Sequence, residues 1–420
     1  MAGAASRRGV LLAAAAGLGL AGCSTTGRAP DPGGAPVPAG AREGVQRLLA
    51  GRSHALRSGD VTALLAGIDP RAAALARAQE AAATAVTGVG VAQWSAEVLR
   101  LRRAPRRREE ELGAPAVLAD VAIRERLDGE DAVVRRAAHL TVVDRGGSWL
   151  LASTADGPTT PALWDLGPVR AARSGRSLVV AAASAPEWAE EVPAVLDEAA
   201  ARVDEAWGTG WPRRTAVLVP ATAADAARLL HRDPAWVAPL AALAVGDASV
   251  PGSGVRVLVQ PEQFGRLSAT GRAVVLTHEL VHVAARTGLG LRGTGSLPLW
   301  LVEGAADQLA RSGRGLDPAE LARPLLQRVA AGMRPTVPTD AELRPGGGAP
   351  LDLAYAAAWT LCESIARRHG AGVLVELQRR LAVPGAPDVS ALAPAVLGED
   401  LPAAEERWRA EVHDGLAGWR

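Results

Sequence analysis

A His-Glu-x-x-His motif, formed by His278, Glu279 and His282, combines residue types and a spacing that can do chemistry. In a helix, residues four apart lie on one face, separated by about 6 Å along the axis. Two imidazoles placed in this way can converge on one Zn²⁺ ion at about 2.0–2.1 Å. Glu279 projects to the side of the pair, where it can take a proton from a water bound to the metal. The motif therefore predicts one zinc ion per chain, beside a general base.

The residues around the motif favour a buried helix. Residues 273–285 are apolar on nearly every side of the expected helix, and Ser268 or Thr270 can cap its start. Two histidines and a glutamate are costly to bury unless something pairs with them, and a metal ion is the simplest partner. The same short motif also occurs by chance in unrelated proteins, so an ordinary packed helix is the alternative.

A second apolar segment, residues 299–307, supplies two carboxylates. Glu303 would complete a His₂Glu ligand set and leave a fourth position open, as in catalytic zinc sites. Asp307 follows one helical turn later on the same face, where it can hold the outer ring nitrogen of a ligand histidine. A capping or salt-bridge role for both acids is the alternative.

The pattern of these residues resembles the gluzincin branch of zinc metallopeptidases and, within it, the peptidase-MA-like group of bacterial proteins. The resemblance covers residues 174–420 and rests on two motifs, His278-Glu279-x-x-His282 and Trp300-Leu301-x-Glu303-Gly304-x-x-Asp307. It implies a zincin-like domain of two lobes, with a mixed sheet that includes an edge strand, followed by a helical lobe. The metal would lie where the two lobes meet.

Two further expectations come from this resemblance. In gluzincins a Tyr or His after the third ligand often stabilises the oxyanion of the tetrahedral intermediate, and Tyr355 begins the helix that matches the family. Packing is the alternative role for Tyr355. The strand expected at residues 255–260, just before the metal helix, would be the edge strand along which an extended substrate can pair. An ordinary sheet strand is the alternative there.

The composition sets the size and the general class of the protein. The chain has 420 residues, of which 48% are hydrophobic, so it can bury a large core in two or three domains. Its 46 basic and 45 acidic residues give a net charge of +1. This balance predicts no nucleic-acid partner.

The first 22 residues are typical of a bacterial lipoprotein signal peptide. Arg7 and Arg8 precede an apolar run, residues 10–20, that is too short to span a membrane as a helix. The sequence Leu20-Ala21-Gly22-Cys23 resembles the lipoprotein box, in which cleavage precedes the cysteine and its thiol carries lipid. An ordinary secretion signal is the alternative.

A lipid on Cys23 would anchor the protein to the extracytoplasmic face of the cell membrane. Residues 23–40 hold many Pro, Gly, Ser and Thr and form the expected flexible tether. The other cysteine, Cys362, is then left alone, which excludes an intrachain disulfide. It lies in an apolar helical segment and is expected to be packed.

The chain between the tether and the metal-binding region divides into two predicted segments, and the whole is predicted to be α+β. Residues 41–156 read as helices followed by four strands, an order that resembles the cone-shaped NTF2-like fold. No cluster of polar residues marks a pocket there, so we predict an accessory domain with a solvated loop at residues 102–111. Residues 157–175 form the expected linker, and residues 176–420 the metallopeptidase domain.

Together these patterns predict a membrane-anchored extracytoplasmic zinc metallopeptidase that hydrolyses peptide bonds in a peptide or protein substrate. Glu279 would act as the general base and Tyr355 as the oxyanion donor. One alternative is a catalytically silent zincin-fold lipoprotein that acts as a binding or scaffold module. A less favoured one is a zinc hydrolase that acts on a non-peptide bond of the cell wall. The sequence leaves the oligomeric state open.

Overall fold

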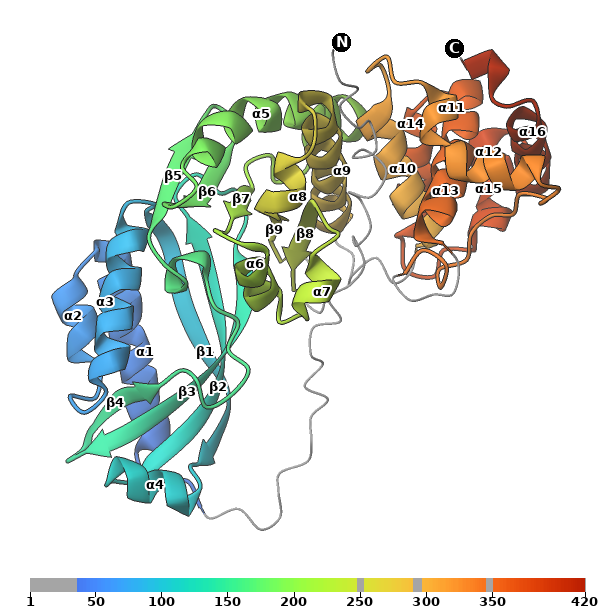
Figure 1. The fold of residues 1–420 in the computed structure, drawn as a ribbon. Helices are drawn as coiled ribbons and strands as arrows, with labels where there is room; N and C mark the ends of the chain where they lie inside the picture. Colours follow the sequence, from blue (N-terminus) through green and yellow to red (C-terminus); the bar gives the residue numbers. More distant parts are fainter. Residues whose placement is uncertain (1–35, 248–252, 290–296, 345–349, 420) are drawn as a thin grey trace.

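The structure is a computed structural model that describes residues 36–247, 253–289, 297–344 and 350–419 (Figure 1). This part of the chain has an α+β fold with two β-sheets, one of four strands and one of five, and a helical lobe at the C-terminal end. The predicted signal peptide (1–22), the lipidation residue Cys23 and most of the predicted tether lie outside the described residues. No helix in the described ranges is long and apolar enough to cross a membrane.

Three helices precede the first sheet, which agrees with the predicted order of helices before strands. They are α1 (Ala41–Ser58), α2 (Val61–Ala66) and α3 (Ala73–Thr87). The antiparallel sheet follows with strands in sequence order, β1 (Val91–Arg103), β2 (Ala116–Leu127), β3 (Val134–Arg145) and β4 (Ser148–Ser153). Helix α1 lies along one face of this sheet because its apolar residues, among them Val45 and Leu49, pack on Trp94 and Val121 (Figure 1). The likeness to the NTF2-like fold stays a prediction.

The charged run at residues 102–111 differs from the expectation of a plain loop. Most of it forms a short helix, α4 (Arg106–Leu112), that begins after Pro105. Arg106 and Arg107 each form a salt bridge to the glutamate four residues later, at 3.0 and 3.1 Å. Pairs at this spacing stabilise a helix by roughly 0.2–0.5 kcal/mol each. The mixture of charges that suggested a solvated loop is therefore what supports the helix.

The second sheet is mixed and has the strand order β5-β6-β7-β9-β8. Its strands are β5 (Val169–Arg173), β6 (Leu178–Ala182), β7 (Ala216–Val219), β8 (Ala242–Gly246) and β9 (Val255–Val259). Strands β6, β7 and β9 run parallel, and the two outer strands pair antiparallel with their neighbours. Both faces are covered, so the central strands are buried throughout, which explains why their sequences are apolar apart from Arg256.

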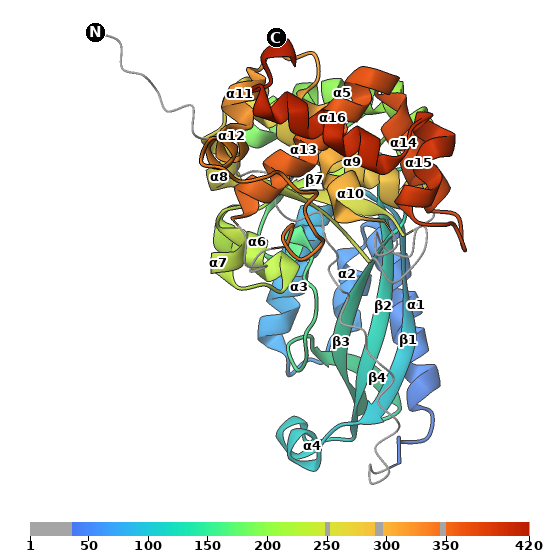
Figure 2. The same ribbon diagram turned by 90° about the vertical axis from the view of Figure 1, so that its right-hand side faces the viewer.

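Different helices cover the two faces of this sheet. Helix α5 (Glu187–Trp207) and helix α9 (Ala269–Gly288), which carries the His-Glu-x-x-His motif, pack on one face, where Val179 and Val257 meet Leu196 and Leu276. The other face packs against α3, α6 (Ala223–Leu230) and α7 (Pro234–Val237). The view at right angles shows the first sheet extending away from this layer toward α4 (Figure 2). The two sheets therefore share one continuous body.

Two expectations about this sheet are wrong. Strand β9 lies between β7 and β8, so the edge strand next to the metal helix is β8, which the sequence pattern did not reveal. The expected linker 157–175 contains β5, which pairs with β6 along its full length. A short 3-10 helix, Leu163–Asp165, precedes that strand. The three prolines of this stretch lie before these short elements, two before the 3-10 helix and one just before β5.

A buried group of charges joins the two sheets. Arg256 of β9 bonds Glu130 with its Nε at 2.8 Å and Glu125 with its Nη1 at 2.7 Å. Arg136 of β3 bonds the other oxygen of Glu125 at 3.1 Å. Burial alone would raise the pKa of Glu125, but the two arginines hold it below its usual value. The cluster therefore fixes the strands of one sheet against those of the other.

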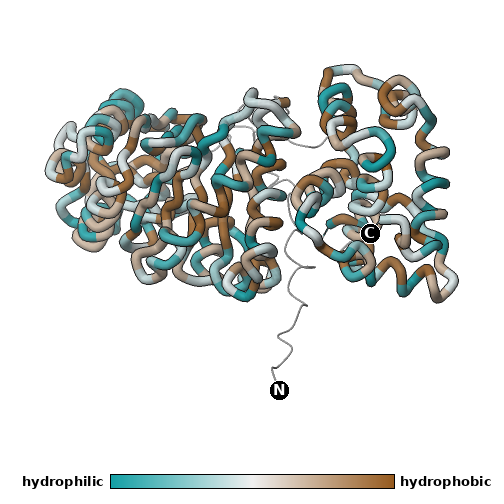
Figure 3. Tube along the Cα trace, turned by 90° about the horizontal axis from the view of Figure 1, so that it is seen from above, coloured by the Kyte–Doolittle hydropathy of each residue, from teal (hydrophilic) through white to brown (hydrophobic). Residues whose placement is uncertain are grey.

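The C-terminal lobe is helical and packs on α9 through its first helix. Its elements are α10 (Leu299–Arg311), α11 (Pro318–Leu321), α12 (Arg323–Ala330), α13 (Leu351–His369), α14 (Gly372–Leu381), α15 (Val389–Leu397), α16 (Leu401–His413) and a 3-10 turn, Ala417–Trp419. Trp408 is fully buried in this lobe and donates a hydrogen bond to Thr360 at 2.9 Å. In the view from above, hydrophobic residues also run through the middle of the part that contains the two sheets, which lies beside this lobe (Figure 3).

Helices α10 and α13 approach each other closely at Gly304. A Cβ atom added there would lie 2.4 Å from the carbonyl oxygen of Ala358 and 2.6 Å from Sγ of the buried Cys362. We expect Gly304→Ala to lower the free energy of unfolding by about 1–3 kcal/mol through overpacking. Urea denaturation measures this change. Gly372→Ala in α14, where an added Cβ meets nothing within 4 Å, is the control and should not destabilise the protein.

Candidate metal centre

Helix α9 presents the His-Glu-x-x-His motif from a fully buried position. Of the two caps considered, the structure uses Ser268, whose hydroxyl accepts a hydrogen bond from the amide of Gly271 at 3.1 Å. All residues from 273 to 285 are buried, as the apolar pattern predicts. The helix packs between α5 and α10 and against the second sheet. Its position is therefore fixed on several sides.

Helix α10 brings the two carboxylates onto the same centre. It begins after Pro298, and the side chain of Asp340 accepts a hydrogen bond from the amide of Leu299 at 2.9 Å. Glu303 and Asp307 lie one turn apart on the face that packs against α9. Both carboxylates are almost completely buried. The prediction that the two segments form adjoining helices is confirmed.

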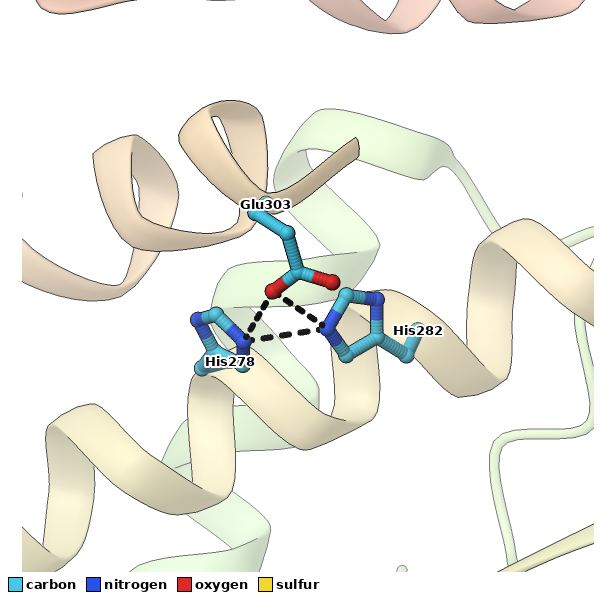
Figure 4. A group of neighbouring side chains, drawn as sticks. All are labelled: His278, His282 and Glu303. Atoms are coloured by element: carbon cyan, nitrogen blue, oxygen red, sulfur yellow. Dashed lines mark hydrogen bonds and ion pairs between the residues drawn. The ribbon is translucent and has the colours of Figure 1, made fainter. Parts of the chain in front are cut away.

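Three side-chain atoms converge between these helices (Figure 4). Nε2 of His278 lies 3.0 Å from Nε2 of His282, and Oε2 of Glu303 lies 3.4 Å from the first of these nitrogens and 3.5 Å from the second. Tetrahedral ligands at about 2.0–2.1 Å from a zinc ion are separated from one another by about 3.3 Å. Two imidazole nitrogens and one carboxylate oxygen are also typical zinc ligands. The three residues therefore fit a zinc ion in both spacing and chemistry.

The hydrogen-bonding state of these atoms also fits a bound cation. His278, His282 and Glu303 have no exposed surface, and neither oxygen of Glu303 has a hydrogen-bond partner among the described residues. A buried carboxylate without such partners is costly unless a cation neutralises it. In this group of three, a metal ion would supply that charge. No fourth protein ligand joins the three in the described part of the chain.

Asp307 orients the first histidine of the motif. Its Oδ1 lies 3.0 Å from Nδ1 of His278, and its Oδ2 forms a salt bridge with Arg311 at 2.8 Å. This contact keeps a proton on Nδ1 and turns Nε2 toward the centre. Burial alone would lower the pKa of His278, but the two acids Asp307 and Glu303 raise it to about 10. A metal ion and a proton compete for the same Nε2 atom.

The contact between Asp307 and His278 leads to a prediction about metal affinity. We expect Asp307→Asn to weaken metal binding by about 10–100-fold, because the amide no longer stabilises the orientation and charge of the ring. Competition with a chelator of known affinity measures the change. Asp317→Asn, at an exposed position that caps α11, is the matched control. Equal metal affinities in Asp307→Asn and the wild type would contradict this role.

Glu279 is held by the edge strand β8. Its Oε2 accepts a hydrogen bond from the amide of Ala244 at 2.6 Å, and the carbonyl of Ala244 accepts one from Arg286 at 2.9 Å. Both backbone groups of Ala244 are thus used by side chains of α9. This position of the edge strand is not open to an extended substrate in the arrangement described.

Arg286 is a candidate that the sequence analysis missed. Burial lowers its pKa, and the negative charges of Glu279 and Glu303 oppose that effect, so the guanidinium lies within the electric field of the site. The sequence spacing could have identified Arg286, because it follows His282 by four residues and so lies on the same face of the helix. An arginine here can balance the charge of the carboxylates.

Tyr355 lies in α13, close to the carboxylate of Glu303. Its hydroxyl is buried and has no hydrogen-bond partner in the described structure. Burial, together with the negative charges of Glu303 and Asp307, raises the pKa of Tyr355 well above its usual value. The phenol therefore keeps its proton and can donate a hydrogen bond. The ring is also part of the core of the helical lobe, so its role as an oxyanion donor stays a prediction.

The comparisons with known proteins give little beyond the geometry. No family model matches the chain, and no curated protein matches it. Among solved structures it is similar to a mutant of the M1 zinc metallopeptidase from Deinococcus radiodurans, with 15% identity and a TM-score of 0.34. The match covers 64% of this chain and 58% of that one, so the chain spans little more than half of the solved structure. A likeness this distant does not assign a family.

The fold and the site together define a class: an α+β protein with a buried cluster of two histidines and a glutamate that can hold a metal ion.

Proposed function

We propose that the protein is a zinc-dependent peptidase, anchored by a lipid on Cys23 to the extracytoplasmic face of a bacterial cell membrane. The observation that carries the catalytic part is the convergence of His278, His282 and Glu303 within 3.5 Å, with Glu279 on the same helix. The membrane anchor rests on the sequence of residues 1–23 alone. Peptides or proteins are the proposed substrates, and nucleic acids are not.

The chain's own residues can share the steps of peptide hydrolysis. When bound, zinc supplies a Lewis acid that polarises a carbonyl group and lowers the pKa of a water molecule toward about 7. Glu279 takes the proton from the attacking water and returns it to the leaving amine. The amide of Ala244 fixes the direction of the Glu279 carboxylate through its 2.6 Å hydrogen bond. The protonated Tyr355 hydroxyl donates a hydrogen bond to the oxyanion.

The absence of exposed surface at the site favours a second candidate function. Because His278, His282 and Glu303 are completely buried, the arrangement described does not admit a peptide. In a catalytically silent scaffold, a metal ion would instead stabilise the packing of α9 on α10. Structural zinc sites, however, generally have four protein ligands, and the described residues supply three. This difference is why we rank the peptidase first.

Turnover distinguishes these candidates. The experiment is digestion of a broad peptide library by the zinc-supplied full-length chain, beside its Glu279→Gln variant. A peptidase cleaves library members and the variant does not. A scaffold protein holds the metal in both forms and cleaves nothing in either.

A further inference from the structure

A cavity of about 670 Å³ lies between the N-terminal helices and the first sheet. None of the metal-centre residues lines it. Most of the residues that line it are apolar, among them Leu49, Leu56, Leu75, Val121, Ile123 and Leu140. Residues of α6 and the following loop close one side. Small-molecule sites typically have volumes of about 300–1,000 Å³ and apolar walls with a few polar groups.

The sequence has no cluster of polar residues that marks this cavity. Among its polar wall groups are Arg52, Gln79, Glu125, Arg136 and Asp165. Each comes from a different helix, strand or turn, so no polar cluster is visible along the sequence. The fold brings these groups together.

Arg52 of α1 is the charged group of this wall whose hydrogen-bonding capacity is not fully used. The side chain is 9% exposed, and its Nη2 donates a hydrogen bond to Oε1 of Gln79. Its Nη1 is buried without a hydrogen-bond partner, and no carboxylate of the described residues forms a salt bridge with Arg52. Burial lowers the pKa of this arginine to about 10, against the opposing effect of Asp165. A buried cation in this state is stabilised by an anion that reaches it.

The other charges near the cavity already have partners. Glu125 is bound by Arg136 and Arg256, at 3.1 and 2.7 Å. One oxygen of Asp165 accepts a hydrogen bond from the amide of Ala162 at 2.8 Å. On the α6 side, Arg228 forms a salt bridge with Asp225 at 3.3 Å, and the guanidinium of Arg232 lies 5.5 Å from the centre of the Trp236 ring. Among the groups of this wall, Arg52 is therefore the one with a buried polar atom, Nη1, that lacks a hydrogen-bond partner in the described structure.

We propose that this cavity binds a small amphiphilic carboxylic acid, with its carboxylate on Arg52 and its apolar body against the leucine-lined walls. A carboxylate forms short, charge-assisted hydrogen bonds with a guanidinium group and would satisfy the free Nη1 atom. The rings of Trp94 and Trp164, which also line the cavity, offer further apolar surface. The ligand would contact both α1 and the α6 side and so join the N-terminal region to the second sheet.

Three probes with the same apolar chain test the charge preference in the wild-type protein. They are dodecanoate, dodecanol and dodecyltrimethylammonium, each titrated into the purified full-length chain by calorimetry. We expect dodecanoate to bind with one site per chain and at least about tenfold more tightly than either of the others. Equal affinities for dodecanoate and dodecanol, or no binding of dodecanoate, would overturn the proposal. This comparison needs no variant and does not depend on metal or peptidase activity.

Substitutions then locate the site. Arg52→Met keeps the length of the side chain without its charge and should weaken dodecanoate binding by about 10–100-fold, with dodecanol affinity unchanged. Arg57→Met, on the same helix but exposed, is the matched control for nonspecific attraction. Ala96→Phe should fill the cavity and abolish binding of both probes while Arg52 is retained. Full dodecanoate affinity in folded Arg52→Met or Ala96→Phe protein would place the ligand elsewhere and overturn the proposal.

Discussion

Replacing Glu279 by glutamine is expected to lower kcat/KM for peptide hydrolysis by about 10²–10⁴-fold while metal binding is retained. Glutamine has the same shape, and its amide oxygen can still accept the hydrogen bond from Ala244. It cannot take a proton from water at neutral pH, so only the proton-transfer step is lost. The measurement is steady-state kinetics of the zinc-supplied full-length chain on a peptide identified by the library digest.

A matched control separates this effect from a general loss of structure. Glu262 in α8 (Pro261–Gly265) is exposed and accepts a hydrogen bond from the amide of Ala223 at 3.3 Å. Glu262→Gln should leave both kcat/KM and metal content unchanged. Full activity of Glu279→Gln on every cleaved peptide would show that another group is the base.

The second large effect concerns stability. Arg256→Ala is expected to lower the free energy of unfolding by about 3–5 kcal/mol, because it leaves the buried Glu130 without a cation and Glu125 with Arg136 alone. These carboxylates lie more than 120 residues away in the sequence, so the loss loosens the contact between the two sheets. Urea denaturation followed by tryptophan fluorescence measures the change. The triple variant with Arg256→Met, Glu125→Gln and Glu130→Gln should recover part of the loss.

An exposed ion pair between the same parts of the chain is the control. Arg214 and Asp131 are 3.1 Å apart, with 52% and 32% of their side-chain surfaces exposed. Exposed pairs are typically worth about 0–1 kcal/mol, so Arg214→Ala should have a small effect. If Arg256→Ala and Arg214→Ala destabilised the protein equally, the buried cluster would not be the main connection.

The metal-centre helices were predictable because their signals are local. In α9 the cap at Ser268 and the apolar run lie within twenty residues of the histidines, and in α10 the two acids are one turn apart. The prediction that Glu303 joins the two histidines in one ligand set rested on a family resemblance as well as on ligand chemistry. The structure brings these residues together, and their roles in catalysis stay predictions.

Features that depend on distant contacts were not predictable. Strand β8 is short and alanine-rich, so its sequence has no alternation, and only its pairing with β9 makes it a strand. Arg256 looks like one charge in an apolar strand, since its partners come from another sheet. Arg52 looks like a surface residue of a helix, and only the fold shows that it is buried beside a cavity.

The zinc content of the purified full-length chain, measured beside that of Glu303→Ala, tests the central claim most directly. We predict about one zinc ion per wild-type chain, with occupancy lost or much reduced in Glu303→Ala. Glu320→Ala, which removes an exposed carboxylate of the same lobe, should bind zinc like the wild type. A folded wild-type protein that takes up no zinc when it is supplied would contradict the metal centre and the peptidase proposal with it.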